Sequence, residues 1–406
     1  MFKNIAHTGM AMAFTFILSM ASTIILGNMM TPDEFGDYAL LKNFILIGAT
    51  FSILGIDQST IRSSRNGKPV FTYKIIILIT AILGALFSVF MTVVFTLPIL
   101  YGIFLWGIIA GTSQLLYLAS IYRLNQKFIF AQMIQNSWKI ILFIISIFAL
   151  FINIPITISH LYYYFFLALI ATLVIHYIYK KEILRDDEMV KDNLNNQRVI
   201  KDGVLLWMLN MSGLLFSGMD RFIIPSISDK GMLGTYYALS FIYLTCFTMI
   251  GSAVGYVIYP YLAQKKDVAW KQIILYTSIL LIVIVAILRI WGNLLNHYAF
   301  SGKYDFVVID NIAVPLLIMG ILQCLNTIIH FYIYARASSN LLKKYVIFLF
   351  ASCFLYYLSF SLFDSFIIYS LSNIIIQILI LWLIKVTISF IVLFRITSIN
   401  INLKPA

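Results

Sequence analysis

The stretch that decides the fold is ISHLYYYFFLALIATLVIHYIY (158–179), followed at once by KKEILRDDEMVKDNLNNQRVIKD (180–202). The first part is predominantly apolar and has the length of about 20 residues that an α-helix needs to cross the hydrocarbon core of a bilayer. The second part is mixed in charge and rich in Asn, which is typical of a solvated linker. We therefore expect a membrane span that leads into a long cytoplasmic linker near the middle of the chain.

The composition of the 406-residue chain independently indicates a membrane protein. Hydrophobic residues make up 62%, the mean hydropathy is +0.96 and only 11% of residues are charged, which excludes a soluble globular class. The net charge of +12 is spread over separate segments, so it favours anionic membrane lipid over nucleic acid as a partner. The three cysteines lie in apolar runs without metal-ligand spacing, so no metal site or other cofactor is expected.

The remaining apolar runs predict the architecture. We expect an all-α integral membrane protein with twelve transmembrane helices in two six-helix bundles around a central cavity. The N-terminal bundle would occupy 1–179, the cytoplasmic linker 180–202 and the C-terminal bundle 203–406. The predicted spans are 8–29, 38–56, 73–97, 101–122, 134–151, 158–179, 203–224, 236–258, 273–291, 313–334, 345–363 and 370–394.

Lys and Arg gather in every second break between these runs, which predicts the topology. All charged residues in the break after the first run are acidic, whereas the next break contains the basic residues Arg62, Arg65 and Lys68. Basic loops stay in the cytoplasm. The alternation continues to the end of the chain and predicts that both termini are cytoplasmic.

A weak repeat at an offset of 198 residues supports two related halves. FGDY (35–38) aligns with LGTY (233–236), each at the start of the second helix of its half. Together with equal helix counts, this favours a duplicated six-helix unit with parallel repeats. Such duplication is typical of transporters that rock one half against the other.

Polar side chains inside the spans are the candidates for function, because charge at membrane depth is costly and is usually kept for a cavity or pathway. Several of them recur at helical spacing and so share one helix face. The candidate substrate contacts are Arg221, Lys139, Asp220, Asn210, Ser217, Gln132, Asn136, Gln323, Asn326, His330, Lys42, Asp57 and Arg289.

Each candidate also has a structural explanation. Asn, Gln and Ser stripes form hydrogen bonds between membrane helices without touching substrate, and this applies equally to His330. Lys42 can extend its ammonium group to the outer interface, and Asp57 and Arg62 can form a local ion pair at the inner boundary. Arg221 and Lys139 lie deeper, which favours a cavity-lining role for them. Arg289 and Lys385, near the ends of their spans, are ambiguous.

Four short stretches resemble a known family: MDRFIIPSISDKGMLGTYYAL (219–239), MTPDEFGDYALL (30–41), GIDQSTIR (55–62) and YVIYPYLAQ (256–264). They are similar to Wzx-type O-antigen and polysaccharide flippases of the multidrug/oligosaccharidyl-lipid/polysaccharide exporter superfamily. In that family an Asp-Arg pair precedes a Leu-Gly-x-Tyr turn, so Asp220 and Arg221 are carried over as site residues. Unlike many drug/cation antiporters of the superfamily, the first span has no acidic residue or Pro.

The resemblance implies a flippase that moves undecaprenyl-diphosphate-linked oligosaccharide units to the periplasmic leaflet of the bacterial cytoplasmic (inner) membrane, in O-antigen or lipopolysaccharide synthesis. A polysaccharide polymerase and a chain-length regulator are its implied partners. Moving about two negative charges outward is favoured by roughly 4 to 5 kcal/mol per 100 mV of inside-negative potential, so a coupling ion, proton or sodium, is not required.

Two other functions remain open at this point. An integral-membrane polysaccharide polymerase or glycosyltransferase is the main alternative, although the largest outer break, 292–312, holds only Lys303, Asp305 and Asp310 as charged residues. A drug/cation antiporter would keep the fold and change the substrate. Since no nucleotide loop, metal-binding helix or nucleophile elbow is present, we expect a transporter and not an enzyme.

Overall fold

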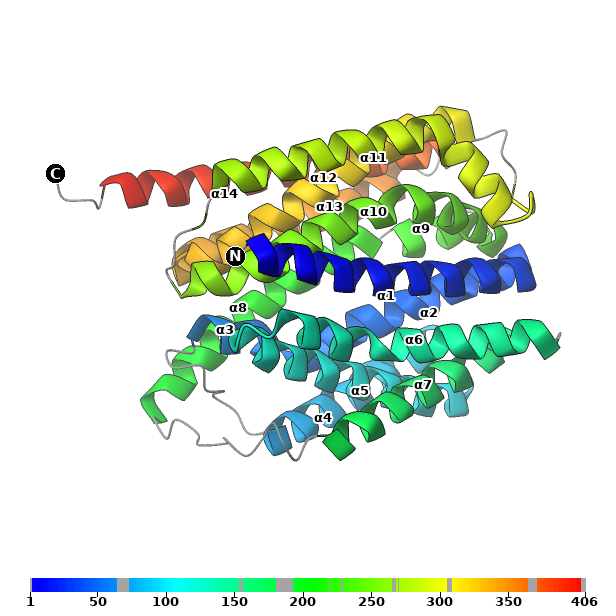
Figure 1. Cartoon of the computed structure of the whole chain (residues 1–406), viewed down its shortest axis with the longest axis horizontal. Coiled ribbons are helices and arrows are strands. Elements are labelled where there is room, and N and C mark those ends of the chain that lie inside the picture. The colour runs from blue at the N-terminus through cyan, green and yellow to red at the C-terminus, as the bar shows by residue number, and fades with distance from the viewer. Residues whose placement is uncertain are drawn as a thin grey trace. The chain divides into compact units, whose positions relative to one another are not determined.

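The computed structural model describes the whole chain except residues 1, 64–72, 153–155, 180–192, 219, 228, 265–267, 269, 305–308, 364–370 and 403–406. The described part is helical and contains no strand (Figure 1). Its helices are α1 (Phe2–Met29), α2 (Pro32–Ile53), α3 (Ile56–Ser63), α4 (Tyr73–Val94), α5 (Ile99–Leu124), α6 (Phe128–Ile152), α7 (Ile158–Tyr179), α8 (Asn193–Gly218), α9 (Asp220–Ile227), α10 (Lys230–Ala263), α11 (Trp270–Ala299), α12 (Ile309–Arg336), α13 (Ser339–Phe363) and α14 (Leu371–Asn402).

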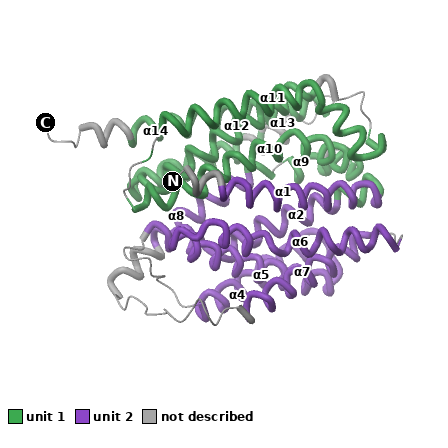
Figure 2. The backbone as a smooth tube through the Cα atoms, in the orientation of Figure 1, with its two compact units in different colours: residues 1, 31–36, 216–406 green, residues 2–30, 37–215 purple. Residues whose placement is uncertain are grey.

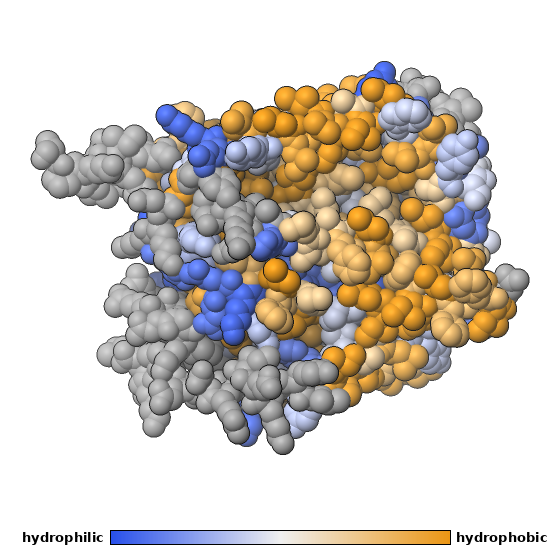
Figure 3. Space-filling view, in the orientation of Figure 1, coloured by the Kyte–Doolittle hydropathy of each residue, from blue (hydrophilic) through white to orange (hydrophobic). Residues whose placement is uncertain are grey.

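Within the described residues, nine helices are long and apolar enough to cross a membrane, and the bent pair α2 and α3 makes a tenth if it forms one span. Their outward faces carry large apolar side chains, as on α11, where Ile274, Ile282 and Ile290 are exposed. Apolar residues also cover much of the visible surface in Figure 3. Such a surface suits lipid and not water. The chain is therefore a multi-pass membrane protein, while the number of twelve spans in two bundles stays a prediction.

The described chain forms two compact units (Figure 2). Unit 2 comprises 2–30 and 37–215, and in it α1 packs on α6, while α5 packs on α3, α4, α6 and α7. Unit 1 comprises 1, 31–36 and 216–406, and in it α12 packs between α10 and α14.

The structure describes only part of the predicted linker 180–202. Residues 180–192 lie outside the described part, and 193–202 form the first turns of α8, which begins at Asn193. The polar residues of this segment lengthen the helix before the apolar run starts. The division into 1–179 and 203–406 stays a prediction.

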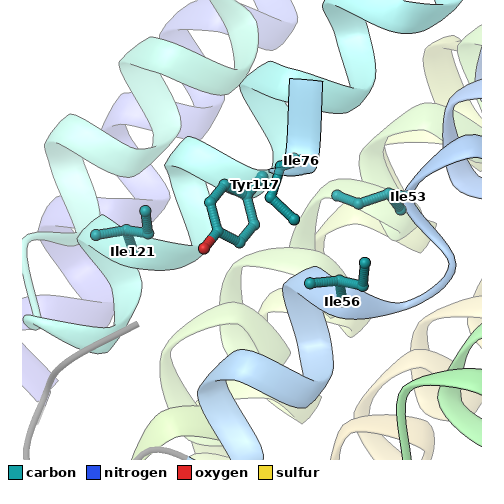
Figure 4. Close-up of a cluster of buried hydrophobic side chains, with 5 residues drawn as sticks. All are labelled: Ile53, Ile56, Ile76, Tyr117 and Ile121. Carbon is teal, nitrogen blue, oxygen red and sulfur yellow. The ribbon is translucent and has the colours of Figure 1, made fainter. Parts of the chain in front are cut away.

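The predicted span 38–56 is wrong as one straight helix, because the chain bends by 53° between α2 and α3. Leu54 and Gly55 have φ values of +50° and +67°, a left-handed conformation that ends an α-helix. A Cβ on Gly55 would overlap the carbonyl oxygen of Gly203, so glycine is also required by the close approach of α8. An apolar cluster surrounds this bend and holds it against α4 and α5; its members are Ile53, Ile56, Ile76, Tyr117 and Ile121 (Figure 4).

The predicted span 203–224 falls on α8 and α9, which lie on either side of residue 219, a position outside the described part. The carboxylate of Asp220 sits in the first turn of α9. The expectation that Asn210, Ser217 and Arg221 share one side of one helix stays a prediction.

The two halves begin their second helices in the same way. Thr31 and Glu34 exchange hydrogen bonds in a capping box at the start of α2, and the Asp229 carboxylate accepts from the Met232 amide at 2.6 Å at the start of α10. Thr31 and Asp229 stand at the same offset of 198 residues. A Cβ on Gly36 would overlap the carbonyl of Lys230, and within unit 1 a Cβ on Gly234 would overlap the carbonyl of Pro32. This reciprocal glycine contact supports the predicted duplication.

Candidate functional site

Two predicted cations come together in unit 2. Lys42 on α2 and Lys139 on α6 are close enough for their charges to repel each other. The Lys42 ammonium donates to the Thr23 hydroxyl of α1 at 3.4 Å. The Lys139 ammonium lies 5.5 Å from the ring centroid of Phe16 and 5.7 Å from that of Trp138. We call Lys42 and Lys139 the lysine pair.

Lys139 has no carboxylate partner among the described residues, and its surroundings are aromatic and cationic. A cation at membrane depth without a counter-charge is costly. Contact with aromatic ring faces offsets only part of that cost. The lysine pair can therefore bind an anionic group, with Lys139 as a compact charge that phosphate oxygens can approach.

Hydrogen-bonding side chains adjoin the lysine pair along α6. The Asn136 amide donates to the Gln132 side-chain oxygen at 2.9 Å, and both residues are buried. Almost three turns further along α6, Ser146 bonds Ser22 of α1 at 3.0 Å. Gln132 and Asn136 thus satisfy each other, and the Ser22–Ser146 bond joins α1 to α6. These contacts agree with the interhelical or intrahelical explanation that the sequence left open.

The other predicted pair, Asp220 and Arg221, lies in unit 1 at the start of α9. Asp220 is buried, and its carboxylate accepts from the Tyr236 hydroxyl at 2.5 Å and from the Arg221 backbone amide at 2.9 Å. The Arg221 guanidinium stacks 5.2 Å from the ring centroid of Tyr237. Its N–H groups donate to no described residue. The planar fork of Arg221 is thereby held by an aromatic face while its donors stay available for a planar or tetrahedral anion.

An aromatic cluster adjoins Arg221 through Tyr237. The Phe35 ring centroid lies 5.3 Å from Tyr237, 5.9 Å from Phe300 and 5.8 Å from Tyr304. Tyr304 lies beyond the end of α11, and burial raises the pKa of its hydroxyl. Rings in this tilted arrangement stabilise one another and fix the position of Tyr237 beneath the guanidinium.

The predicted stripe on α12 is confirmed as one helix face that is buried within unit 1. His330 bonds the Tyr345 hydroxyl of α13 at 2.6 Å, and Ser389 of α14 bonds the Asn326 side-chain oxygen at 3.0 Å. Tyr345 and Ser389 also bond each other at 2.5 Å. We call these four residues the α12–α14 network. It joins three helices, which agrees with the structural explanation for Asn326 and His330.

The other candidates are dispersed. Asp57 is buried on α3, where its carboxylate accepts from the Gln58 amide at 2.9 Å and interacts with the charge of Arg123 on α5. The neighbouring Arg62 pairs at 3.7 Å with Asp202 of α8, a distant partner that sequence reasoning, which named Asp57, did not identify. Gln323 is buried on α12, Asn210 is half-buried on α8, and Ser217 and Arg289 are exposed. Their roles in substrate binding stay predictions.

Sequence reasoning did not assign Lys385, which is only 1% exposed on α14. Its ammonium lies 4.5 Å from the ring centroid of Trp382 and 4.6 Å from that of Phe216. The signal available in the sequence was a cation well inside the apolar span Leu371–Ile396, whose other cation, Arg395, lies at its end. Position near one end of the span made it look like an interfacial lysine, and only packing shows that it is enclosed.

Comparison with known proteins identifies the family. The sequence pattern of the family described as polysaccharide biosynthesis protein matches residues 1–266. The chain belongs to the polysaccharide biosynthesis protein family. The matched part includes α1 to α10 and therefore both the lysine pair and the Asp220–Arg221 pair. The resemblance to Wzx-type flippases drawn from the sequence is confirmed at the level of family and superfamily fold. No curated protein matches the sequence significantly.

Solved structures show that this family member has the fold of the multidrug/oligosaccharidyl-lipid/polysaccharide (MOP) exporter superfamily. A MOP superfamily transporter from Pyrococcus furiosus, described as having a binding pocket of reverse polarity, aligns with a TM-score of 0.68 at 14% identity over 98% of this chain and 96% of that one. A Vibrio cholerae MATE transporter aligns with a TM-score of 0.66 at 12% identity over 97% and 96%. A MATE transporter in complex with Br-NRF aligns with a TM-score of 0.66 at 15% identity over 98% and 94%.

Proposed function

We propose that the protein is a flippase that moves undecaprenyl-diphosphate-linked oligosaccharide units from the cytoplasmic to the periplasmic leaflet by alternating access. The observation that carries the proposal is Lys139, a cation in a membrane-spanning helix of a polysaccharide biosynthesis protein that has no described carboxylate partner. Its local environment lacks the counter-charge that a diphosphate would supply. Both termini are placed in the cytoplasm and the protein in the bacterial inner membrane, with a polymerase and a chain-length regulator as partners.

The chemistry of such a substrate suits the two charged sites. Only the diphosphate and sugars need a polar path, because the polyprenyl tail can remain in lipid. Lys139 would contact phosphate oxygens as a point charge, and Arg221 through its fork. The outward movement of the anion follows an inside-negative membrane potential.

The test substitutes Lys139 by Gln in a strain that depends on this gene for surface polysaccharide. A charge-assisted hydrogen bond contributes about 1.5–3 kcal/mol, so the initial rate of transport should fall roughly 10- to 150-fold. Lys127→Gln removes the same charge from an exposed position just before α6 and should retain full transport. Lys139→Arg should retain part of the rate. Wild-type polysaccharide from Lys139→Gln at normal protein abundance would contradict the proposal.

The leaflet in which intermediates accumulate separates the flippase from a polymerase. Loss of a flippase leaves single lipid-linked units on the cytoplasmic face, whereas loss of a polymerase leaves them on the outer face. Protection of the units from a membrane-impermeant sugar-oxidising reagent in intact spheroplasts distinguishes the two.

Export of drugs is the second candidate, favoured by the fold shared with MATE transporters. The lack of any acid in α1 and the cationic character around Lys139 argue against a cationic drug as substrate. Increased susceptibility of a deletion strain to cationic drugs, with unchanged surface polysaccharide, would favour this candidate over the flippase.

A further inference from the structure

Lys385 is enclosed within unit 1 in a way that no role in substrate binding explains. Its side chain is 1% exposed and lies between the rings of Phe216 and Trp382. Its described partners are these rings, the Cys353 thiol and the His330 imidazole, and none is a carboxylate. Transferring a fixed charge into such a site is costly. A lysine, unlike an arginine, can give up its charge by releasing a proton.

A second basic group lies close to it. His330 on α12 is 7% exposed and bonds Tyr345, which bonds Ser389, whose hydroxyl lies 2.9 Å from the Lys385 backbone carbonyl; the charge of Lys385 also acts on the His330 imidazole. Two positive charges this close would repel strongly in a low-dielectric interior. The two bases therefore compete for one proton.

The α12–α14 network indicates which histidine nitrogen is basic. The Ser389 hydroxyl has one hydrogen, and its two acceptors are the Asn326 side-chain oxygen at 3.0 Å and the Lys385 backbone carbonyl at 2.9 Å, so Ser389 must accept from Tyr345. Tyr345 in turn has no hydrogen left for the imidazole and must accept from His330 Nε2 at 2.6 Å. This assignment, made from the bonding pattern, places the hydrogen of neutral His330 on Nε2 and leaves Nδ1 as the atom that can take up a proton.

The groups around the two bases supply no competing negative charge in the described structure. Around the pair, α8 contributes Phe216, α13 contributes Tyr345 and Cys353, and α12 contributes His330 itself together with Cys324 and Tyr334. The described tyrosines and cysteines of α10, which packs on α12, are Tyr236, Tyr237, Tyr243, Cys246, Tyr256, Tyr259 and Tyr261. Lys343 and Lys344 of α13 and Arg395 of α14 are exposed.

We propose that Lys385 and His330 form a proton-binding site inside unit 1 that holds one proton, and that loading and unloading of this proton accompany the transport cycle. The link to transport rests on the proposed function, whereas the proton site does not. No bond other than N–H forms or breaks, and the proton exchanges with water. If this proton moves inward as the anionic head moves outward, both movements follow an inside-negative potential.

Trp382 provides a direct test, because an ammonium 4.5 Å from an indole ring perturbs its emission. The purified full-length protein in lipid nanodiscs would be titrated from about pH 5 to about pH 10, a range that covers His and Lys titration. Subtracting the titration of Trp382→Phe isolates the signal of this tryptophan. We expect one transition in wild type, none in Lys385→Met, and a transition of larger amplitude in His330→Gln, because Lys385 then no longer shares the proton with a competing base. Trp291→Phe, on exposed α11, should leave the transition unchanged.

Two results would overturn the proton site: emission of Trp382 that does not change over this range, or a transition that persists in Lys385→Met. Circular dichroism and size-exclusion profiles confirm that each variant is folded, and Lys385→Arg, which keeps the charge at every pH, provides a second variant that should lack the transition.

The transport link is measured separately in proteoliposomes that contain undecaprenyl-diphosphate N-acetylglucosamine as the probe. A pH gradient should change the rate of probe movement in wild type at least threefold and leave Lys385→Met unaffected. An equal response of both proteins would refute the link. If the wild-type protein moves no probe but Trp382 still reports the transition, the flippase proposal fails and the proton site stands.

Discussion

The hydroxyls of Tyr236 and Tyr38 occupy equivalent places in the two halves but should differ in their contribution to stability. Both tyrosines are 1% exposed and stand at the offset of 198 residues. Tyr236 donates to the Asp220 carboxylate at 2.5 Å, whereas Tyr38 and the Thr23 hydroxyl are 3.3 Å apart. Substitution of either tyrosine by Phe removes only the hydroxyl and keeps the ring.

The magnitudes follow from the partners. Tyr236→Phe leaves a buried carboxylate oxygen without its short donor, which should reduce the free energy of unfolding by about 2–3 kcal/mol. Tyr38→Phe removes a long bond between neutral hydroxyls, and about 0.5–1 kcal/mol is expected. The Phe ring at 38 would still face the Lys42 ammonium, which lies 5.1 Å from the Tyr38 ring centroid, so that contact is common to both proteins.

The assay is reversible unfolding of the purified protein in mixed micelles by increasing SDS, followed by circular dichroism. The double variant Asp220→Asn with Tyr236→Phe forms the fourth corner of a mutant cycle and isolates the coupling between the two side chains. Equal losses for Tyr38→Phe and Tyr236→Phe, or a coupling below about 0.5 kcal/mol, would refute the assignment of a strong bond to Asp220.

Two glycine substitutions test the backbone contacts. Gly36→Ala should destabilise the protein by about 1–3 kcal/mol, because the new Cβ would overlap the carbonyl of Lys230 and relieving the overlap requires a backbone shift. Its control is Gly9→Ala, which should be neutral or stabilising because no atom lies within 4 Å of the new Cβ. Gly55→Ala should cost at least about 1–2 kcal/mol from its positive φ, and more from overlap with the Gly203 carbonyl, whereas Gly213→Ala is the matched control in open space. SDS unfolding measures all four variants, and a Gly36→Ala protein as stable as Gly9→Ala would contradict the close contact.

The sequence predicted the helices well where apolar runs alone decide them. The run 158–179 coincides with α7, and 101–122 and 236–258 lie inside α5 and α10. It failed at the bend at 54–55, because hydropathy does not change there. The bend depends instead on backbone conformation and on contact with a distant segment, through the approach of Gly203 to Gly55.

For the candidate site, the sequence could supply residue types but not partners. It singled out Lys139 and Arg221 because cations are rare at membrane depth, and the structure places each against aromatic rings. Helical spacing correctly grouped Asn326 with His330, but it could not show that both are bonded to α13 and α14. The role of Lys385 was left ambiguous, because its depth in the membrane was judged only from its position along the predicted span.

Ser22 and Thr23 of α1 stand at the offset of 198 residues from Asp220 and Arg221 of α9. Thr23 contacts Tyr38 of α2, and Asp220 accepts from Tyr236 of α10, with the two tyrosines at the same offset. Both units therefore hold this tyrosine hydroxyl against the preceding helix, but only unit 1 uses a charged group for it. Unit 2 carries the lysine pair on α2 and α6, whereas unit 1 carries the Arg221 guanidinium, so the two units present chemically different cations.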